Sequence, residues 1–153
     1  MPTLEMILTG LVTGVIGALL MNLILRWISA TFAEPLNMVE VLGSFFNTDP
    51  KRAVYLGTVL HLVSGAVFGV IYVWFLYLIG AHVGLTPLFA GVGMGFFHGL
   101  LVSYILMFFV RDSHPIESFR RASLQVGVFY LFVHAVYGGF VGAATGILGL
   151  LSS

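Results

Sequence analysis

Residues 86–110 read TPLFAGVGMGFFHGLLVSYILMFFV, a run that contains no aspartate, glutamate, lysine or arginine. A helix needs about 20 apolar residues to cross the hydrocarbon core of a bilayer. The span within this run is predicted at about 87–110, and three further stretches have the same character, at about 4–32, 53–79 and 124–151. Because an unpaired backbone polar group is costly in lipid, each stretch is expected to be helical in spite of its many glycines.

The composition agrees with a membrane protein. Of the 153 residues, 59% are hydrophobic and 8% are charged, whereas soluble domains carry about 25% charged residues. The net charge is zero, so no basic surface points to a nucleic-acid partner, and the absence of cysteine excludes disulfides and thiolate metal sites. We therefore expect an all-α polytopic membrane protein, a single four-transmembrane-helix bundle over residues 1–153.

The basic residues predict its orientation. All six lie in or near the loops 33–52 and 111–123: Arg26, Lys51, Arg52, Arg111, Arg120 and Arg121. Basic residues stay on the cytoplasmic side of a membrane, so these loops are expected inside and both termini outside, in a prokaryotic cytoplasmic membrane. Within the first loop, residues 35–46 are apolar but too short to span, which indicates an interfacial or a re-entrant segment.

Small residues recur at a spacing of four along each predicted helix. Lipid gives helices no hydrophobic reason to associate, so small residues are used to let their backbones approach closely. These stripes are Gly10, Gly14, Ala18 with Asn22 and Arg26; Gly57, His61, Gly65, Gly69; Gly91, Gly95, Gly99; and His134, Gly138, Gly142, Gly146. We expect them to be the packing faces of the bundle.

Toward the middle of each predicted span lies one amide or imidazole side chain: Asn22, His61, His98 and His134. Counted from the inner loops at about 1.5 Å per residue, all four lie near the middle of the bilayer. Polar groups are costly at that depth and usually face the interior of a bundle. The sequence therefore predicts one shared polar layer.

Imidazole is a ligand for iron, copper and zinc, so the layer predicts a cofactor site with His61, His98 and His134 as ligands. The cofactor would be haem b, held between facing helices, or a copper or zinc ion. Supporting contacts are expected from Asn22, Met94 and Tyr130. Contacts to haem propionates or lipid headgroups are expected from Arg26, Lys51, Arg52 and Arg111. The loop histidines His82 and His114 are expected to face water.

Two other interpretations stay open. The chain could be a structural accessory subunit whose polar core forms hydrogen bonds and binds no ligand, or a proton-linked transporter of a small solute. The preferred one is a small membrane subunit that binds haem or a metal ion inside a larger redox complex. No catalytic constellation is recognisable, so an enzyme acting alone is not expected. The expected partners are the lipid bilayer and other membrane subunits or further copies of the chain.

The histidine and glycine pattern also carries a resemblance. Gly57, His61 and Gly65 form G-x-x-x-H-x-x-x-G, and residues 91–99 form G-x-x-x-G-x-x-H-G. With the early glycines of the first span and the histidine of the fourth, the chain resembles small uncharacterised four-helix membrane proteins of prokaryotes. That group has no established activity, so the resemblance implies the architecture and no function.

Overall fold

The computed structural model describes residues 4–32, 37–121 and 123–151, and these residues form helices and no strand. The helices are α1 (Leu4–Phe32), α2 (Met38–Ser44), α3 (Pro50–Leu78), α4 (Thr86–Ile105), η1 (Leu106–Val110), α5 (Arg111–Ser113), α6 (Glu117–Arg120) and α7 (Leu124–Leu151). Four stretches are long and apolar enough to cross a membrane: α1, α3, the continuous run Thr86–Ser113, and α7.

The predicted spans coincide with these helices to within three residues at each end. Helix α3 begins at Pro50, ahead of the apolar run that starts at residue 53, because Asp49 caps it. The Asp49 carboxylate accepts a hydrogen bond of 3.0 Å from the backbone nitrogen of Arg52, and Pro50 occupies the first turn. A proline is well placed there, since its missing N–H would have no partner in the helix.

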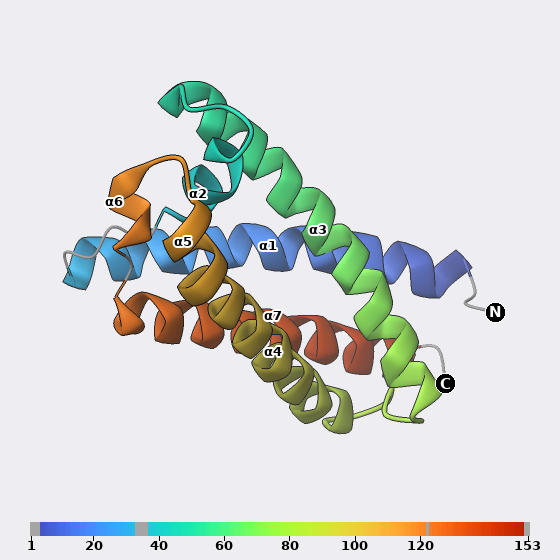
Figure 1. The fold of residues 1–153 in the computed structure, drawn as a ribbon. Helices are drawn as coiled ribbons and strands as arrows, with labels where there is room; N and C mark the ends of the chain where they lie inside the picture. The colour runs from blue at the N-terminus through green and yellow to red at the C-terminus, as the bar shows by residue number, and fades with distance from the viewer. Residues whose placement is uncertain (1–3, 33–36, 122, 152–153) are drawn as a thin grey trace.

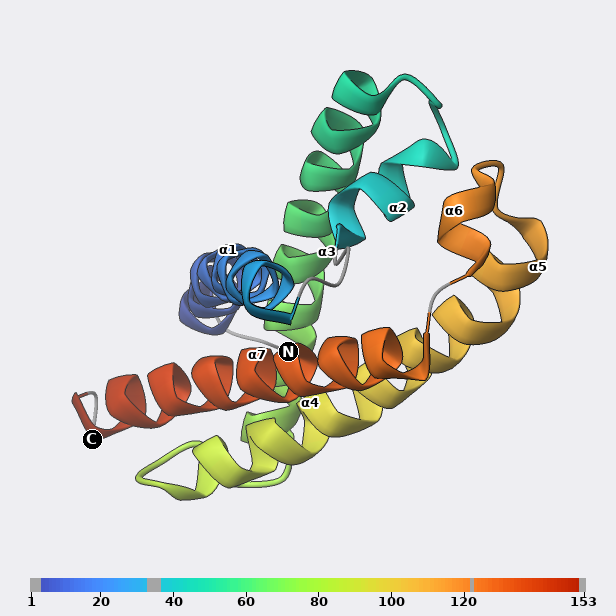
Figure 2. The same cartoon turned by 90° about the vertical axis from the view of Figure 1, so that its left-hand side faces the viewer.

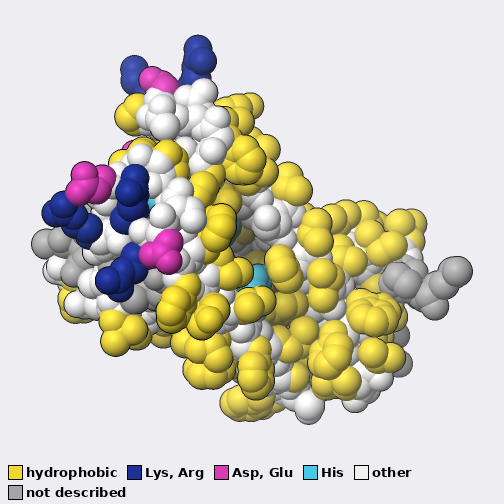
Figure 3. All heavy atoms as spheres, in the orientation of Figure 1, with side chains coloured by type: hydrophobic (Ala, Val, Ile, Leu, Met, Phe, Trp, Pro, Cys, Tyr) yellow, Lys and Arg dark blue, Asp and Glu magenta, His cyan; other side chains and the backbone are white. Residues whose placement is uncertain are grey.

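The long helices pack as two close pairs, α1 with α3 and α4 with α7 (Figures 1 and 2). Helix α1 also lies against α7, whereas α3 and α4 barely touch. The N- and C-terminal ends of the chain lie at one end of the bundle, and the short helices α2, α5 and α6 lie at the other (Figure 1). Positive and negative side chains gather at that second end, and hydrophobic side chains cover most of the remaining visible face (Figure 3).

Glycine stripes form both close pairs, as predicted. Where α1 crosses α3, a Cβ added to Gly14 would lie 2.2 Å from the carbonyl oxygen of Gly65. Where α4 crosses α7, a Cβ on Gly91 would lie 2.1 Å from the carbonyl oxygen of Gly138. No side chain fits in either place, so the two backbones of each pair are in direct van der Waals contact.

Helix α2 packs on the first two turns of α3 by the same device. A Cβ on Gly43 would meet the carbonyl oxygen of Ala53 at 1.8 Å, and one on Gly57 would meet that of Val39 at 1.6 Å. The apolar segment predicted at 35–46 is therefore a short helix fixed against α3; its first two residues lie outside the described part of the chain.

Two glycines of α4 that are two residues apart, Gly95 and Gly93, allow the close packing of α4 on α7 to be tested. Gly95→Ala is expected to lower the free energy of unfolding by about 1–3 kcal/mol, because the new methyl group would lie 2.2 Å from the His134 carbonyl oxygen. Gly93→Ala is the matched control. Nothing lies within 4 Å of its Cβ, so it should stabilise the helix by up to about 1 kcal/mol. Thermal unfolding in detergent measures both, and equal effects would contradict the crossing.

Candidate functional site

A cavity of about 540 Å³ lies where α3 and α4 fail to pack. Side chains of α3 and α4 form its two walls, and Ala18 and Met21 of α1 and Tyr130 and Tyr137 of α7 lie along its base. Helix α2, the residues Phe45 and Phe46 that follow it, and η1 close the cavity at one end. This is the end of the bundle where the charged side chains gather, called the charged end below. The lining is mostly apolar, and the volume is within the range of about 300–1,000 Å³ typical of small-molecule sites.

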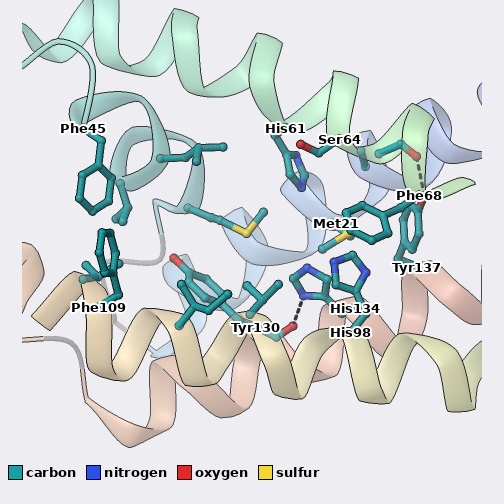
Figure 4. A pocket seen from close by; sticks show the side chains of 18 of the residues that line it. Met21, Phe45, His61, Ser64, Phe68, His98, Phe109, Tyr130, His134 and Tyr137 are labelled. Carbon is teal, nitrogen blue, oxygen red and sulfur yellow. Dashed lines mark hydrogen bonds between the residues drawn. The ribbon is translucent and has the colours of Figure 1, made fainter. Parts of the chain in front are cut away.

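The three span histidines meet in this cavity, as the sequence predicted. His61 of α3, His98 of α4 and His134 of α7 all line it, and Figure 4 shows their rings pointing into the same space from opposite walls. The His98 and His134 rings touch edge to face, with their centroids 4.8 Å apart. They come from helices whose backbones are in contact, so their separation is fixed by the α4–α7 crossing.

His134 is held in one tautomer. Its Nδ1 lies 2.6 Å from the backbone carbonyl oxygen of Tyr130, one turn earlier on α7. A carbonyl oxygen can only accept, so Nδ1 carries the proton and the outer nitrogen, Nε2, keeps a lone pair. Histidines that bind metals show this arrangement, in which the second nitrogen donates to a carbonyl or carboxylate and fixes the ring.

His98 is fixed by aromatic neighbours on α3. Its Nδ1 lies 3.2 Å from the hydroxyl of Tyr72, and its ring centroid lies 4.0 Å from that of Phe68. These contacts are among the few that join the two walls. Tyr137 adds another link from the base, since its buried hydroxyl donates a 2.6 Å hydrogen bond to the backbone carbonyl of Gly65.

Of the three histidines, His61 is the one with an unpaired buried ring nitrogen. Its Nδ1 is buried and has no hydrogen-bond partner in the described part of the chain. Leaving such a group unpaired costs about 1–3 kcal/mol, and the His61 side chain lines the cavity. His82 has an equally orphaned Nδ1, but it stacks on Tyr77 outside the cavity.

Asn22 does not join the histidines. It lines a second, smaller pocket of about 260 Å³, together with Arg26. A spacing of four advances about 40° around a helix at each step, because a turn takes 3.6 residues. The stripe that begins at Gly10 and Gly14 therefore continues on the buried face through Met21 and Leu25. Asn22 lies to the side of that face.

Of the other predicted supporting residues, some line the histidine cavity and some do not. Tyr130 lines the cavity and positions His134, as expected of a supporting residue. Met94 packs against the hydrophobic core and does not line the cavity. None of the predicted cations lines it either: Arg26 lines the second pocket, and Lys51, Arg52 and Arg111 are exposed near the charged end.

The histidine cluster does not have the geometry of a preformed metal-ion site. No group of three or more His, Cys, Asp or Glu side chains in the described ranges is placed to hold one ion. His98 and His134 adjoin each other, but His61 stands on the opposite wall (Figure 4). The arrangement can provide one imidazole ligand to a larger group lying between the walls.

The cavity opens sideways. In Figure 3 a histidine side chain is visible at the bottom of a hollow, and hydrophobic side chains surround the opening. The charged side chains lie away from the opening, at the end of the bundle.

The expectation that His114 faces water is wrong. Its side chain is fully buried, and its Nδ1 accepts a 3.1 Å hydrogen bond from the backbone nitrogen of Ile116. Its Nε2 lies 3.1 Å from both the Val41 carbonyl oxygen and the Ser44 hydroxyl. His114 therefore fastens the second loop of the charged end to α2, across the closed end of the cavity. A histidine before a proline gives no sequence signal for this role.

Sequence reasoning also missed Ser64 and Phe68, which line the cavity on α3. Both follow His61 at helical spacings of three and seven, so their position on its face could have been noticed. Comparison with protein-family models, curated proteins and solved structures gave no match to this chain. The arguments about the site therefore rest on its own residues.

The Tyr137 hydroxyl gives a prediction about the shape of the cavity. Tyr137→Phe is expected to lower the free energy of unfolding by about 0.5–1.5 kcal/mol, because it removes a buried hydrogen bond between α7 and α3. Tyr104→Phe is the control, since Tyr104 is 61% exposed, and it should change stability little. Thermal unfolding of the two variants in the same detergent measures this, and equal losses would mean that the bond contributes nothing.

Proposed function

We propose that this chain is a small membrane subunit that binds haem b in the cavity between α3 and α4, with His134 as an axial ligand, as part of a larger membrane redox complex. The observation that carries the proposal is the hydrogen bond from His134 Nδ1 to the Tyr130 carbonyl. It leaves Nε2 as the free nitrogen in a mostly apolar cavity, and histidine is the usual proximal ligand of haem iron.

The rest of the cavity supports this choice. Aromatic side chains such as Phe68, Tyr130 and Tyr137 line it, and flat apolar surfaces suit a macrocycle. Haem needs only one or two protein ligands, and His134 is the one proposed here. A copper or zinc ion would need three ligands around one point, and His61 would have to move to complete them.

The protein is proposed to span a prokaryotic cytoplasmic membrane four times, with both termini outside and loops 33–52 and 111–123 inside. All six basic residues belong to the charged end or the helical turns next to it. Cytoplasmic loops carry the excess of lysine and arginine, so this end is assigned to the inside. Helix α2 then lies at the inner interface. Large exposed aromatic residues such as Trp27, Phe89 and Phe97 would face lipid or a partner subunit.

The haem proposal is tested by absorption spectroscopy. Protein purified in mild detergent from cells supplied with a haem precursor is expected to show a Soret band that shifts on reduction with dithionite. His134→Ala should lower the haem content by at least about tenfold, since even supporting residues of metal sites cost 10–100-fold. His82→Ala, which removes a histidine outside the cavity, should leave the spectrum unchanged.

Metal analysis of the same sample separates the alternatives. Stoichiometric copper or zinc, lost in the His98→Ala variant, would replace haem by an ion. A colourless, metal-free protein that is nevertheless folded would contradict both. It would leave the structural accessory subunit, for which co-purifying membrane proteins are the readout, or the transporter, for which proteoliposome flux is the readout.

The orientation is tested by single cysteines, because the chain has none of its own. Leu85→Cys lies in the exposed turn between α3 and α4, and Ser118→Cys lies on exposed α6. On intact cells a membrane-impermeant maleimide should label the first cysteine and reach the second only after lysis. The reverse pattern would invert the proposed topology.

A further inference from the structure

The second pocket has a different character from the histidine cavity. It lies between α1, α2 and α3 and has a volume of about 260 Å³. Leu19 and Leu23 form one part of its lining, and the polar side chains Asn22, Arg26 and Asn37 form another. A site with an apolar part and a cationic part fits an amphiphile better than a free ion or an apolar cofactor.

The depth of Arg26 in the bilayer indicates which kind of amphiphile the second pocket binds. Helix α1 has 29 residues and is therefore about 43 Å long, close to the thickness of a bilayer with its headgroups, about 40–45 Å. Arg26 lies six residues before Phe32, or about 9 Å from the end of the helix. Each headgroup layer is about 5–7 Å thick, so Arg26 lies at the boundary between headgroups and acyl chains.

The guanidinium of Arg26 has no ion pair in the described part of the chain, where the salt bridge found is the one between Arg121 and Glu117. The carboxylate of α2, that of Glu40, accepts a hydrogen bond from the Asn37 amide. Arg26 is exposed, and a long arginine side chain near the end of a membrane helix extends its guanidinium toward the headgroups. Phosphate is the anion that lipid supplies at this depth, and arginine binds it in a bidentate manner.

We propose that the second pocket binds one phospholipid of the inner leaflet, with its phosphodiester on Arg26 and Asn22 and an acyl chain along Leu19 and Leu23. Asn37 can add a donor, since its amide has a second N–H beside the one given to Glu40. Bound there, the lipid would join α1 to α2, and Met38 of α2 lines both this pocket and the histidine cavity. The proposal rests on the proposed membrane insertion and orientation but not on haem.

Native mass spectrometry of delipidated protein in detergent tests the site. Phosphatidylglycerol is expected to bind the wild-type protein with a one-to-one component that Arg26→Gln weakens by about tenfold or more, because a charge-assisted bidentate contact is lost. Arg121→Gln is the matched control, since Arg121 is exposed and paired with Glu117, and it should bind like the wild type. Asn22→Leu gives a second, milder loss if the Arg26 variant does not fold.

Two competitors identify the ligand. Diacylglycerol with the same acyl chains lacks the phosphate, so its affinity for the wild type should be as low as that of phosphatidylglycerol for the Arg26→Gln variant. Inorganic phosphate lacks the acyl chains, so it should not displace the bound lipid. Equal binding of diacylglycerol, displacement by phosphate, or equal losses in the Arg26 and Arg121 variants would each overturn the proposal. Failure of the haem spectrum would not affect this result, whereas a reversed labelling pattern would overturn the assignment to the inner leaflet.

Discussion

The direct contact between the backbones of α4 and α7 is the constraint on which the site depends. A Cβ on Gly95 would meet the His134 carbonyl oxygen, and one on Gly99 would lie 2.9 Å from the His134 Cβ. The glycine that follows His98 thus lies against the base of the other histidine. At so short a helix separation two imidazoles on the same level must touch, which explains the edge-to-face contact of their rings.

The cavity is the consequence of unequal packing. Helix α3 is in backbone contact with α1 through Gly65 and Gly69, and helix α4 is in backbone contact with α7. Each pair follows its own glycine stripe, so the two pairs are free to diverge. Two contacts between α3 and the α4–α7 pair are made by long side chains, with Tyr137 reaching the Gly65 carbonyl and Tyr72 reaching His98. Because these side chains are long, they join the helices that surround the cavity while leaving the helix backbones apart.

Much of this architecture could be predicted from the sequence, because four long apolar runs and a spacing of small residues are local signals. The helix bounds, the packing stripes and the convergence of His61, His98 and His134 follow from them. Asn22 was misplaced because a spacing of four rotates steadily around a helix, and over the three steps from Gly10 to Asn22 the drift reaches about 120°. His114 was missed because its burial depends on α2, an element far away in the sequence, to which no local pattern connects it.

The two orphan nitrogens show why the cavity, and not the histidine content, is the argument for a ligand. His61 and His82 both bury an Nδ1 without a partner in the described residues, yet they differ in what surrounds them. The His82 ring is covered by Tyr77, with centroids 4.3 Å apart and planes nearly parallel. No further molecule is needed to cover the His82 ring, and its unpaired Nδ1 costs the protein one hydrogen bond. His61 instead faces about 540 Å³ of space shared with two more imidazoles. That shared space, and not the unmet hydrogen bond, is the feature on which the proposed haem site rests.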